Sequence, residues 1–311
     1  MSLPLKELIK IGENQLKEAG IADAARDAKT LYCFMDKLDS VGLMMHWQDV
    51  LQDKVGEEYF RLIERRASGE PLQYITGTQD FMGLTFNVNP SVPIPRQDTE
   101  TMVEDALEIL REGTLRGEKY YGASNAREIL DLCCGSGAIG VSVAKLFPKA
   151  KVTCSELSGE ALKTAEENAR VNGCKGIKFV QGDLFSPFCG RLGKKKFDFI
   201  ISNPPYIESD VIPTLQREVK DHEPVMALDG GKDGLDFYRR IAAEAPEHLH
   251  KKGILMMEIG YNQGEAVKAL LDETQKFTDI QVLKDLADKD RIITAVLKGK
   301  KAENRGISKN T

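Results

Sequence analysis

The stretch that decides the fold is Ile129-Leu130-Asp131-Leu132-Cys133-Cys134-Gly135-Ser136-Gly137-Ala138-Ile139-Gly140. An apolar run of strand length enters a glycine-rich turn, and residues that can begin a helix follow directly. Glycine has no side chain, so a ligand can approach the backbone of such a turn closely. The stretch therefore predicts a strand, a turn and a helix that together bind an adenosine-like ligand. The glycine pattern alone also fits a tight turn without a ligand.

Short strand-like runs alternate with helix-length segments through most of the chain after residue 96. This alternation is typical of a doubly wound α/β sheet. Residues 285–290 are too few for a crossover helix, so the last two strands should pair antiparallel at one edge of the sheet. We expect a helix at about residues 99–111 and seven strands, at residues 128–132, 151–155, 177–181, 197–202, 253–259, 280–284 and 291–297.

The N-terminal part of the chain has a different pattern. From residue 3 to about residue 69 apolar residues recur at intervals of three and four, which predicts a small helical bundle. Tyr74-Ile75-Thr76 and residues 84–88 are instead β-prone and alternating, which favours a hairpin. We place a helical domain at residues 1–73, a β-hairpin linker at 74–95 and an α/β domain at 96–298. The polar tail, residues 299–311, is expected to be disordered.

Composition excludes several classes of function. The 311 residues are 41% apolar and 29% charged, and we find no run that could cross a bilayer and no signal peptide, so we expect a cytoplasmic protein. A formal net charge of −5 argues against a protein that must neutralise many phosphates of naked duplex DNA, although it leaves room for a local basic face. The six cysteines are irregularly spaced and only four histidines are present, so we expect neither a metal site nor a disulfide framework.

Polar side chains follow the next two predicted strands. Glu156 ends the strand after the glycine-rich turn, where a carboxylate can accept hydrogen bonds from both hydroxyls of a ribose. Asp183 and Leu184 end the third strand and offer an acceptor and an apolar face to an adenine ring. These residues also suit a nicotinamide cofactor, so they establish only a ligand that contains adenosine.

The motif Asn203-Pro204-Pro205-Tyr206 directly follows the buried strand at residues 197–202. Its position places it at the same carboxyl edge of the sheet as the glycine-rich turn, so both motifs should face one crevice. Proline lacks an N–H group, so this turn presents carbonyl acceptors, and Asn203 adds a side-chain carbonyl. Such a turn can bind both hydrogens of a planar NH₂ group, while Tyr206 lies against its face.

A planar nitrogen of this kind is a poor nucleophile, so the chemistry calls for alignment with a strongly activated methyl donor. S-adenosylmethionine is such a donor, and S-adenosylhomocysteine would be the product. We assign catalysis to Asn203, Pro204 and Tyr206, and we assign no general base because the nitrogen becomes very acidic as the methyl group is transferred.

Nearly the whole chain resembles the release factor glutamine N5-methyltransferases, often called PrmC or HemK. Besides the two motifs, the resemblance includes the segments at residues 69–77, 94–100 and 230–235, and Glu223-Pro224. The family usually has Gly-Thr where this chain has Cys133-Cys134, and commonly Asp in place of Glu156. The resemblance implies a seven-stranded, Rossmann-like class I methyltransferase domain preceded by a helical domain that recognises the substrate.

The implied substrate is the glutamine of the Gly-Gly-Gln motif in class I peptide chain release factors, methylated at its side-chain amide nitrogen. The partner would be a release factor, without direct nucleic-acid binding or a membrane, and the enzyme is expected to be a monomer. Together the motifs and the resemblance assign the cofactor to Cys133, Cys134, Gly135, Ser136, Gly137, Glu156, Asp183, Leu184 and Asn203, and the substrate amide to Asn203, Pro204, Pro205 and Tyr206.

Two other functions remain open at this level. A nucleic-acid adenine N6-methyltransferase would use the same turn for an exocyclic amine, but it would need a module that reads its target, and no basic, aromatic-rich segment follows the motif. A binding protein that kept the fold without activity is the second alternative. Arg96, Asp98 and Glu100 can be read as a salt-bridged helix start, and Glu223 and Asp233 either as loop anchors or as acceptor contacts.

Overall fold

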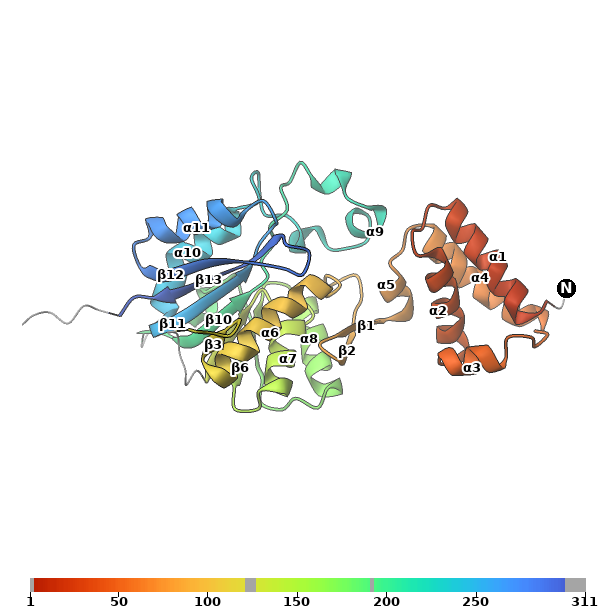
Figure 1. Cartoon of the computed structure of the whole chain (residues 1–311), viewed down its shortest axis with the longest axis horizontal. Coiled ribbons are helices and arrows are strands. Elements are labelled where there is room, and N and C mark those ends of the chain that lie inside the picture. Colours follow the sequence, from red (N-terminus) through yellow and green to blue (C-terminus); the bar gives the residue numbers. More distant parts are fainter. Residues whose placement is uncertain (1–2, 121–126, 191–192, 300–311) are drawn as a thin grey trace, which may run out of the picture.

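The computed structural model describes residues 3–120, 127–190 and 193–299, and it shows a helical domain beside a larger α/β domain (Figure 1). Tyr32, Tyr59 and Ile63 are fully buried in the helical core, as the three- and four-residue spacing predicts. The helical domain contains α1 (Leu5–Glu18), α2 (Ala24–Asp36), α3 (Ser40–Met45) and α4 (Asp53–Ala67).

A short helix, α5 (Leu72–Thr76), and a hairpin of β1 (Thr78–Phe81) and β2 (Leu84–Asn87) connect the two domains. The hairpin prediction is correct at β2, but the β assignment of Tyr74-Ile75-Thr76 is wrong because these residues are helical. Tertiary contacts explain the difference: Ile75 packs into the helical core, and the Tyr74 hydroxyl donates to the Val92 carbonyl at 2.6 Å. Gly77, with a φ of 78°, then ends the helix.

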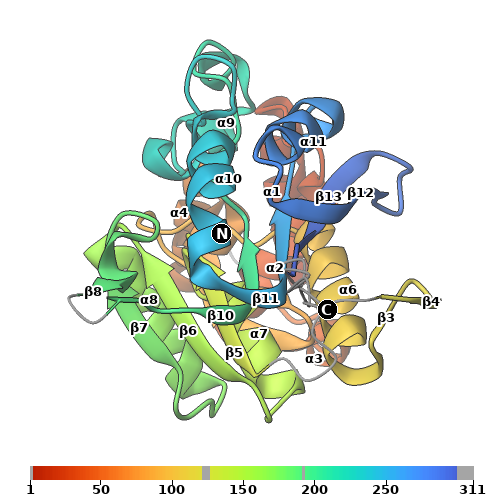
Figure 2. The ribbon, with the colours of Figure 1, turned by 90° about the vertical axis from the view of Figure 1, so that its left-hand side faces the viewer.

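The described residues of the α/β domain form a seven-stranded sheet in the order β12-β13-β11-β10-β5-β6-β7 (Figure 2). Five neighbouring strands of this order pair in parallel: β11, β10, β5, β6 and β7. Strand β13 is antiparallel to both β11 and β12, which confirms the expected edge hairpin. The strands are β5 (Glu128–Leu132), β6 (Lys151–Glu156), β7 (Lys178–Gln181), β10 (Phe197–Ser202), β11 (Leu249–Glu258), β12 (Phe277–Lys284) and β13 (Asp290–Leu297). The order in which strands are added changes at β5: β6 and β7 follow it toward one edge of the sheet, whereas β10 and β11 lie on its other side. Ligands bind at such a switch point.

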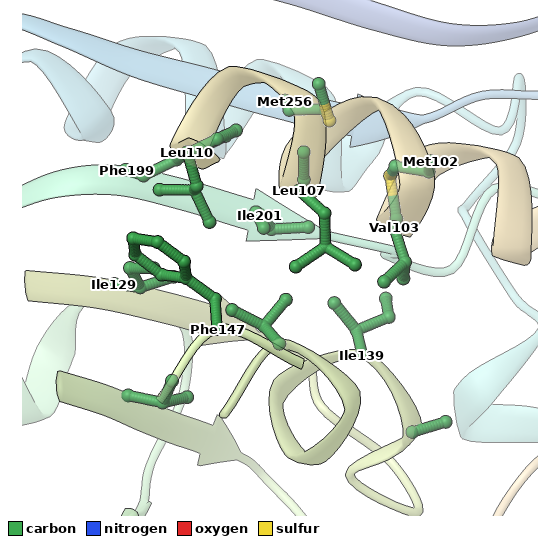
Figure 3. Close-up of a cluster of buried hydrophobic side chains, with 14 of the residues drawn as sticks. Met102, Val103, Leu107, Leu110, Ile129, Ile139, Phe147, Phe199, Ile201 and Met256 are labelled. Carbon is green, nitrogen blue, oxygen red and sulfur yellow. The ribbon is translucent and has the colours of Figure 1, made fainter. Parts of the chain in front are cut away.

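Helices cover both faces of the sheet because alternate strand residues point to opposite sides. Ile129 and Ile201 face α6 (Gln97–Glu112), α7 (Ala138–Leu146) and α8 (Gly159–Val171), whereas Leu130 and Ile200 face α10 (Asp236–His248) and α11 (Gly264–Glu273). Figure 3 shows the first of these layers, with Met102, Val103, Leu107 and Leu110 of α6 directed toward the sheet.

The remaining elements are short and lie in the connections. They are β3 (Thr114–Leu115), β4 (Glu118–Lys119), β8 (Cys189–Gly190), β9 (Gly193–Lys194), α9 (Arg217–Lys220) and three 3-10 turns at Ser186–Phe188, Ile212–Thr214 and Val225–Ala227. Of the tail that was expected to be disordered, residues 300–311 lie outside the described residues.

A buried arginine joins the two domains. Arg66 of α4 is 4% exposed and donates to Asp27 of α2 at 2.8 Å and to Glu218 of α9 at 2.7 Å. Arg217 adds a hydrogen bond to the Ser68 carbonyl at 2.8 Å. The helical domain is therefore tied to the segment that follows the acceptor motif.

Three general features bear on function. None of the helices in the described ranges is both long and apolar enough to span a membrane. Over the same ranges no three His, Cys, Asp or Glu side chains gather as a metal site would require. All six cysteines are free thiols.

Candidate active site

An open pocket of about 670 Å³ lies at the carboxyl ends of β5, β6, β7 and β10, where the sequence predicts the ligand. Of the residues expected to hold a cofactor it brings together Cys133, Gly135, Glu156, Asp183, Leu184 and Asn203, and its lining also includes Pro205 and Phe237.

Backbone amides orient the carboxylate of Glu156 at the end of β6. One oxygen, Oε2, accepts from the Gly135 amide at 2.9 Å, and Oε1 accepts from the amides of Leu157 at 2.8 Å and Ser158 at 3.0 Å. A carboxylate has about four lone-pair positions and these contacts use three of them, so Oε2 can still accept from a ligand that enters the pocket.

The glycine-rich turn follows β5 with left-handed backbone conformations. The φ angles are 61° at Cys133, 52° at Gly135 and 78° at Gly137. A non-glycine residue rarely adopts this conformation, so Cys133 stands at a position that favours glycine. Gly137 lies away from both pockets and caps α7, where an added Cβ would meet the Cβ of Ala165 at 3.0 Å.

Asp131 of β5 holds the residues that follow the glycine-rich turn. Its side chain is 1% exposed, and Oδ2 accepts from the Gly140 amide at 2.8 Å. Burial raises the pKa of Asp131 to about 7, and the nearby charge of Glu156 adds to the increase. The Asp131 carboxyl therefore fixes the start of α7 through the Gly140 amide. Its burial makes ionisation of this carboxyl unfavourable.

Asp183 and Leu184 lie on the opposite wall of the pocket, after β7. Asp183 Oδ2 accepts from Arg240 Nη2 of α10 at 2.7 Å, so one oxygen is already paired. Leu184 is 4% exposed and adds apolar surface.

A second open pocket, of about 1030 Å³, adjoins the first. Both pockets are lined by Pro93, Cys133, Gly135, Asn203 and Ala227, so Asn203 lies at their junction. Of the residues that the sequence assigns to the site, the second pocket also receives Cys134, Ser136, Pro204 and Tyr206; its further lining includes Arg96, Thr99, Glu223 and Glu258.

The acceptor turn is held rigidly after β10. Gln263 donates through Nε2 to the Tyr206 carbonyl at 2.9 Å, and the Tyr206 hydroxyl donates to Glu258 Oε1 at 3.4 Å. Burial raises the pKa of Tyr206, and the charge of Glu258 raises it further, so the phenol stays protonated. Among the described residues no donor reaches the Pro204 carbonyl oxygen, and Pro204 lines the second pocket.

Glu223 and Arg96 form an ion pair in the wall of the second pocket. Glu223 is 5% exposed, accepts from Arg96 Nη2, and accepts from the Ile94 amide at 3.3 Å. Burial raises the pKa of Glu223, and Arg96 opposes that increase. Glu223 thus anchors the linker to the acceptor side of the cleft.

Other charged residues named at the sequence level also serve as anchors. Asp98 pairs with Arg291 at 3.0 Å, and Glu100 accepts from the Met82 amide of the hairpin at 2.5 Å. Asp233 pairs with Arg239 of α10 and lies outside the lining of both pockets.

Comparisons with known proteins identify the family. Residues 7–77 match the PrmC N-terminal domain and residues 119–220 match the methyltransferase small domain. The chain is 38% identical over 292 residues to a release factor glutamine methyltransferase of Clostridium botulinum, covering 94% of this chain and 98% of that protein. The corresponding Geobacter sulfurreducens protein is 40% identical over 289 residues, with 93% and 95% covered.

The chain belongs to the release factor glutamine methyltransferase family. This confirms the resemblance inferred from the motifs and the linker. A solved protein-(glutamine-N5) methyltransferase from Alicyclobacillus acidocaldarius is 28% identical, with a TM-score of 0.41 over 69% of this chain and all of that one.

Methyltransferases of this family use S-adenosylmethionine, and the first pocket of this methyltransferase fits that cofactor. The adenosine would need a carboxylate for its ribose and apolar walls for its base, which Glu156, Leu184 and Phe237 offer. The bare backbone of Gly135 leaves room at the turn, because an added Cβ would already meet Pro93 at 3.3 Å.

Sequence reasoning missed three polar residues of this methyltransferase site. Asp131 carries a recognisable signal, a carboxylate within an apolar strand just before the glycine-rich turn. Glu258 stands at the carboxyl end of β11 and Thr99 in the first turn of α6, and they are 159 residues apart. No local pattern marks such a pair.

Proposed function

We propose that this methyltransferase transfers the methyl group of S-adenosylmethionine to the side-chain amide nitrogen of the glutamine in the Gly-Gly-Gln motif of class I release factors. The position of Asn203 carries the proposal, because this residue lines both the pocket that fits the cofactor and the adjoining pocket. A methyl group can pass directly between two ligands only where their sites meet.

The acceptor turn suits a primary amide. The side-chain oxygen of Asn203 and the open carbonyl of Pro204 can each accept one of the two amide hydrogens. The Tyr206 ring contributes an apolar wall, because its hydroxyl is already bonded to Glu258. With both hydrogens held, the nitrogen can adopt only a narrow range of orientations.

Orientation is the main contribution that these residues make to the reaction. When bound, S-adenosylmethionine supplies an electrophilic methyl carbon attached to a positively charged sulfur. Alignment of a weak nucleophile can lower a barrier by up to about 7–11 kcal/mol in favourable cases. The carbonyl oxygens of Asn203 and Pro204 also stabilise the positive charge that develops on the nitrogen. The resulting proton is acidic, so no general base is assigned.

We also propose that residues 1–73 help to recognise the release factor. A third open space lies between this domain and the linker, and its lining includes Phe34 and Gln73. Its lining also includes Ile94, Pro95 and Arg96, which line the second pocket, called here the acceptor pocket. A bound protein could therefore contact the helical domain while its glutamine occupies the acceptor pocket.

The test is transfer of labelled methyl from S-adenosylmethionine to a purified class I release factor, beside a version whose tripeptide glutamine is changed to alanine. We expect label in the first protein only. Equal labelling of both proteins would overturn the proposed target, and labelling of added DNA or RNA in their place would favour an adenine methyltransferase.

A further inference from the structure

Two buried residues outside the acceptor turn connect to Asn203 through hydrogen bonds. Glu258 is 2% exposed and Thr99 is 4% exposed. The Thr99 hydroxyl donates to Glu258 Oε2 at 2.6 Å, and Asn203 donates through Nδ2 to the Thr99 hydroxyl oxygen at 3.4 Å. The chain of contacts thus runs from the end of β11, through the first turn of α6, to the residue at the junction of the two pockets.

The direction of these hydrogen bonds follows from the number of protons. An ionised carboxylate can only accept, so the single hydroxyl hydrogen of Thr99 is donated to Glu258. The Thr99 oxygen is then only an acceptor toward Asn203, and it selects the NH₂ end of that amide. The other end, the Oδ1 oxygen, is left free for a ligand. The opposite amide orientation would present a donor to the NH₂ group of a substrate.

We propose that Thr99 and Glu258 are positioning residues that hold the Asn203 amide with its oxygen available to the substrate amide. The inference rests on the proposed function, because it assumes that the acceptor is a primary amide. Both residues also line the second pocket, but the role assigned to them is indirect: Glu258 acts on Thr99, and Thr99 acts on Asn203.

The surroundings of Glu258 favour the acceptor role. The Tyr206 hydroxyl donates to Glu258 Oε1, and Arg291 of β13 lies close enough to stabilise the negative charge of Glu258. Asp98, on α6, acts in the opposite sense. Burial raises the pKa of Glu258 above its ordinary value, and the Thr99 hydrogen bond and Arg291 limit that increase.

The test compares two substitutions at one position. Thr99→Val keeps the shape of the side chain but removes the hydroxyl, whereas Thr99→Ser keeps the hydroxyl. We expect Thr99→Val to lower kcat for release factor methylation by roughly 10- to 100-fold and Thr99→Ser to restore most of it. Affinity for S-adenosylmethionine, measured by calorimetry, should change by less than about twofold, because the hydroxyl lies on the acceptor side.

Thr294→Val is a matched control. Thr294 is fully buried in β13, and its hydroxyl pairs with Tyr120 and not with the acceptor turn. The Thr294→Val variant also loses a buried hydroxyl. A similar loss of kcat in this variant would therefore show that the kcat loss of Thr99→Val comes from altered packing. If Thr99→Val does not fold, Thr99→Ala is compared with Thr99→Ser in the same way.

A second readout depends on pH. A protonated Glu258 can donate to Thr99, which frees the Thr99 hydrogen for Asn203 and reverses the orientation of the amide. The ratio of wild-type kcat to Thr99→Val kcat should therefore fall toward one as the pH is lowered through the pKa of Glu258. A ratio that stays constant with pH would overturn the proposal that Glu258 sets the orientation of Asn203 through Thr99.

The outcomes separate the inference from the function on which it rests. A wild-type protein that does not methylate the release factor would contradict the proposed function. A wild-type protein that methylates it, with Thr99→Val equally active, would contradict only the role of Thr99 and Glu258.

Discussion

Replacing Asp131 by asparagine should make the stability of the chain less dependent on pH. The carboxyl is 1% exposed, one oxygen accepts from the Gly140 amide, and the other has no hydrogen-bond partner among the described residues. Burial raises the pKa of Asp131 from 3.8 to about 7. The folded protein thus binds this proton more tightly than the unfolded chain, and stability is lost as the pH rises from about 4 to 7.

The size of the effect follows from this difference in pKa. Between pH 5 and pH 8, ionisation of such a carboxyl removes about 2–3 kcal/mol from the free energy of unfolding. Asparagine cannot ionise, but its amide oxygen can still accept from Gly140. Its NH₂ group takes the place of an unpaired oxygen and costs about 1–3 kcal/mol at every pH. Relative to the wild type, Asp131→Asn should therefore gain about 2–3 kcal/mol on going from pH 5 to pH 8.

Urea denaturation followed by circular dichroism, at several pH values between 5 and 8, measures this difference. Asp288→Asn is the control for loss of charge, because the Asp288 side chain is 87% exposed. A constant difference between Asp131→Asn and the wild type across that pH range would refute the reasoning.

Three further predictions concern the cofactor, the acceptor and the domain contact. Asn203→Ala should abolish methyl transfer and change the calorimetric Kd for S-adenosylmethionine by less than about threefold, since the acceptor contact is lost and most cofactor contacts remain. Glu156→Ala should weaken cofactor binding about 10- to 100-fold, because a charge-assisted hydrogen bond is lost. Arg66→Met should lower the free energy of unfolding by about 3–5 kcal/mol, since it removes the nearer of the two arginines beside the buried Asp27 and leaves only Arg26, at 3.6 Å.

Each of these predictions has a result that contradicts it. Near-normal turnover by the Asn203 variant would remove this residue from the positioning of the amide. An unchanged Kd for the Glu156 variant would place the ribose elsewhere. A melting temperature for Arg66→Met equal to that of the wild type would show that the buried Asp27 does not depend on Arg66.

The layout of the sheet could be predicted because its signals are local. Residues 128–132 and 197–202 are strands of the expected length, and each leads into the motif that the pockets bring together. The edge hairpin followed from one short connection, residues 285–290. Turns with glycine or proline directly after buried strands are the features that a single sequence marks most clearly.

The errors and omissions depend on contacts between distant residues. Tyr74-Ile75-Thr76 is β-prone by composition, but the helical core and the Val92 carbonyl make it helical. Thr99 and Glu258 meet across 159 residues, so no spacing rule could pair them. The left-handed backbone at Cys133 also follows from the turn around it and not from cysteine itself.

Locating the transferred methyl group tests the central claim most directly. After reaction with S-adenosylmethionine, the release factor is digested and the peptide that contains Gly-Gly-Gln is fragmented in a mass spectrometer. The geometry of Asn203 and Pro204 predicts a single methyl group on the side-chain amide of that glutamine. A methyl group on a backbone nitrogen, on another residue, or on no residue while S-adenosylmethionine binds normally would contradict the account.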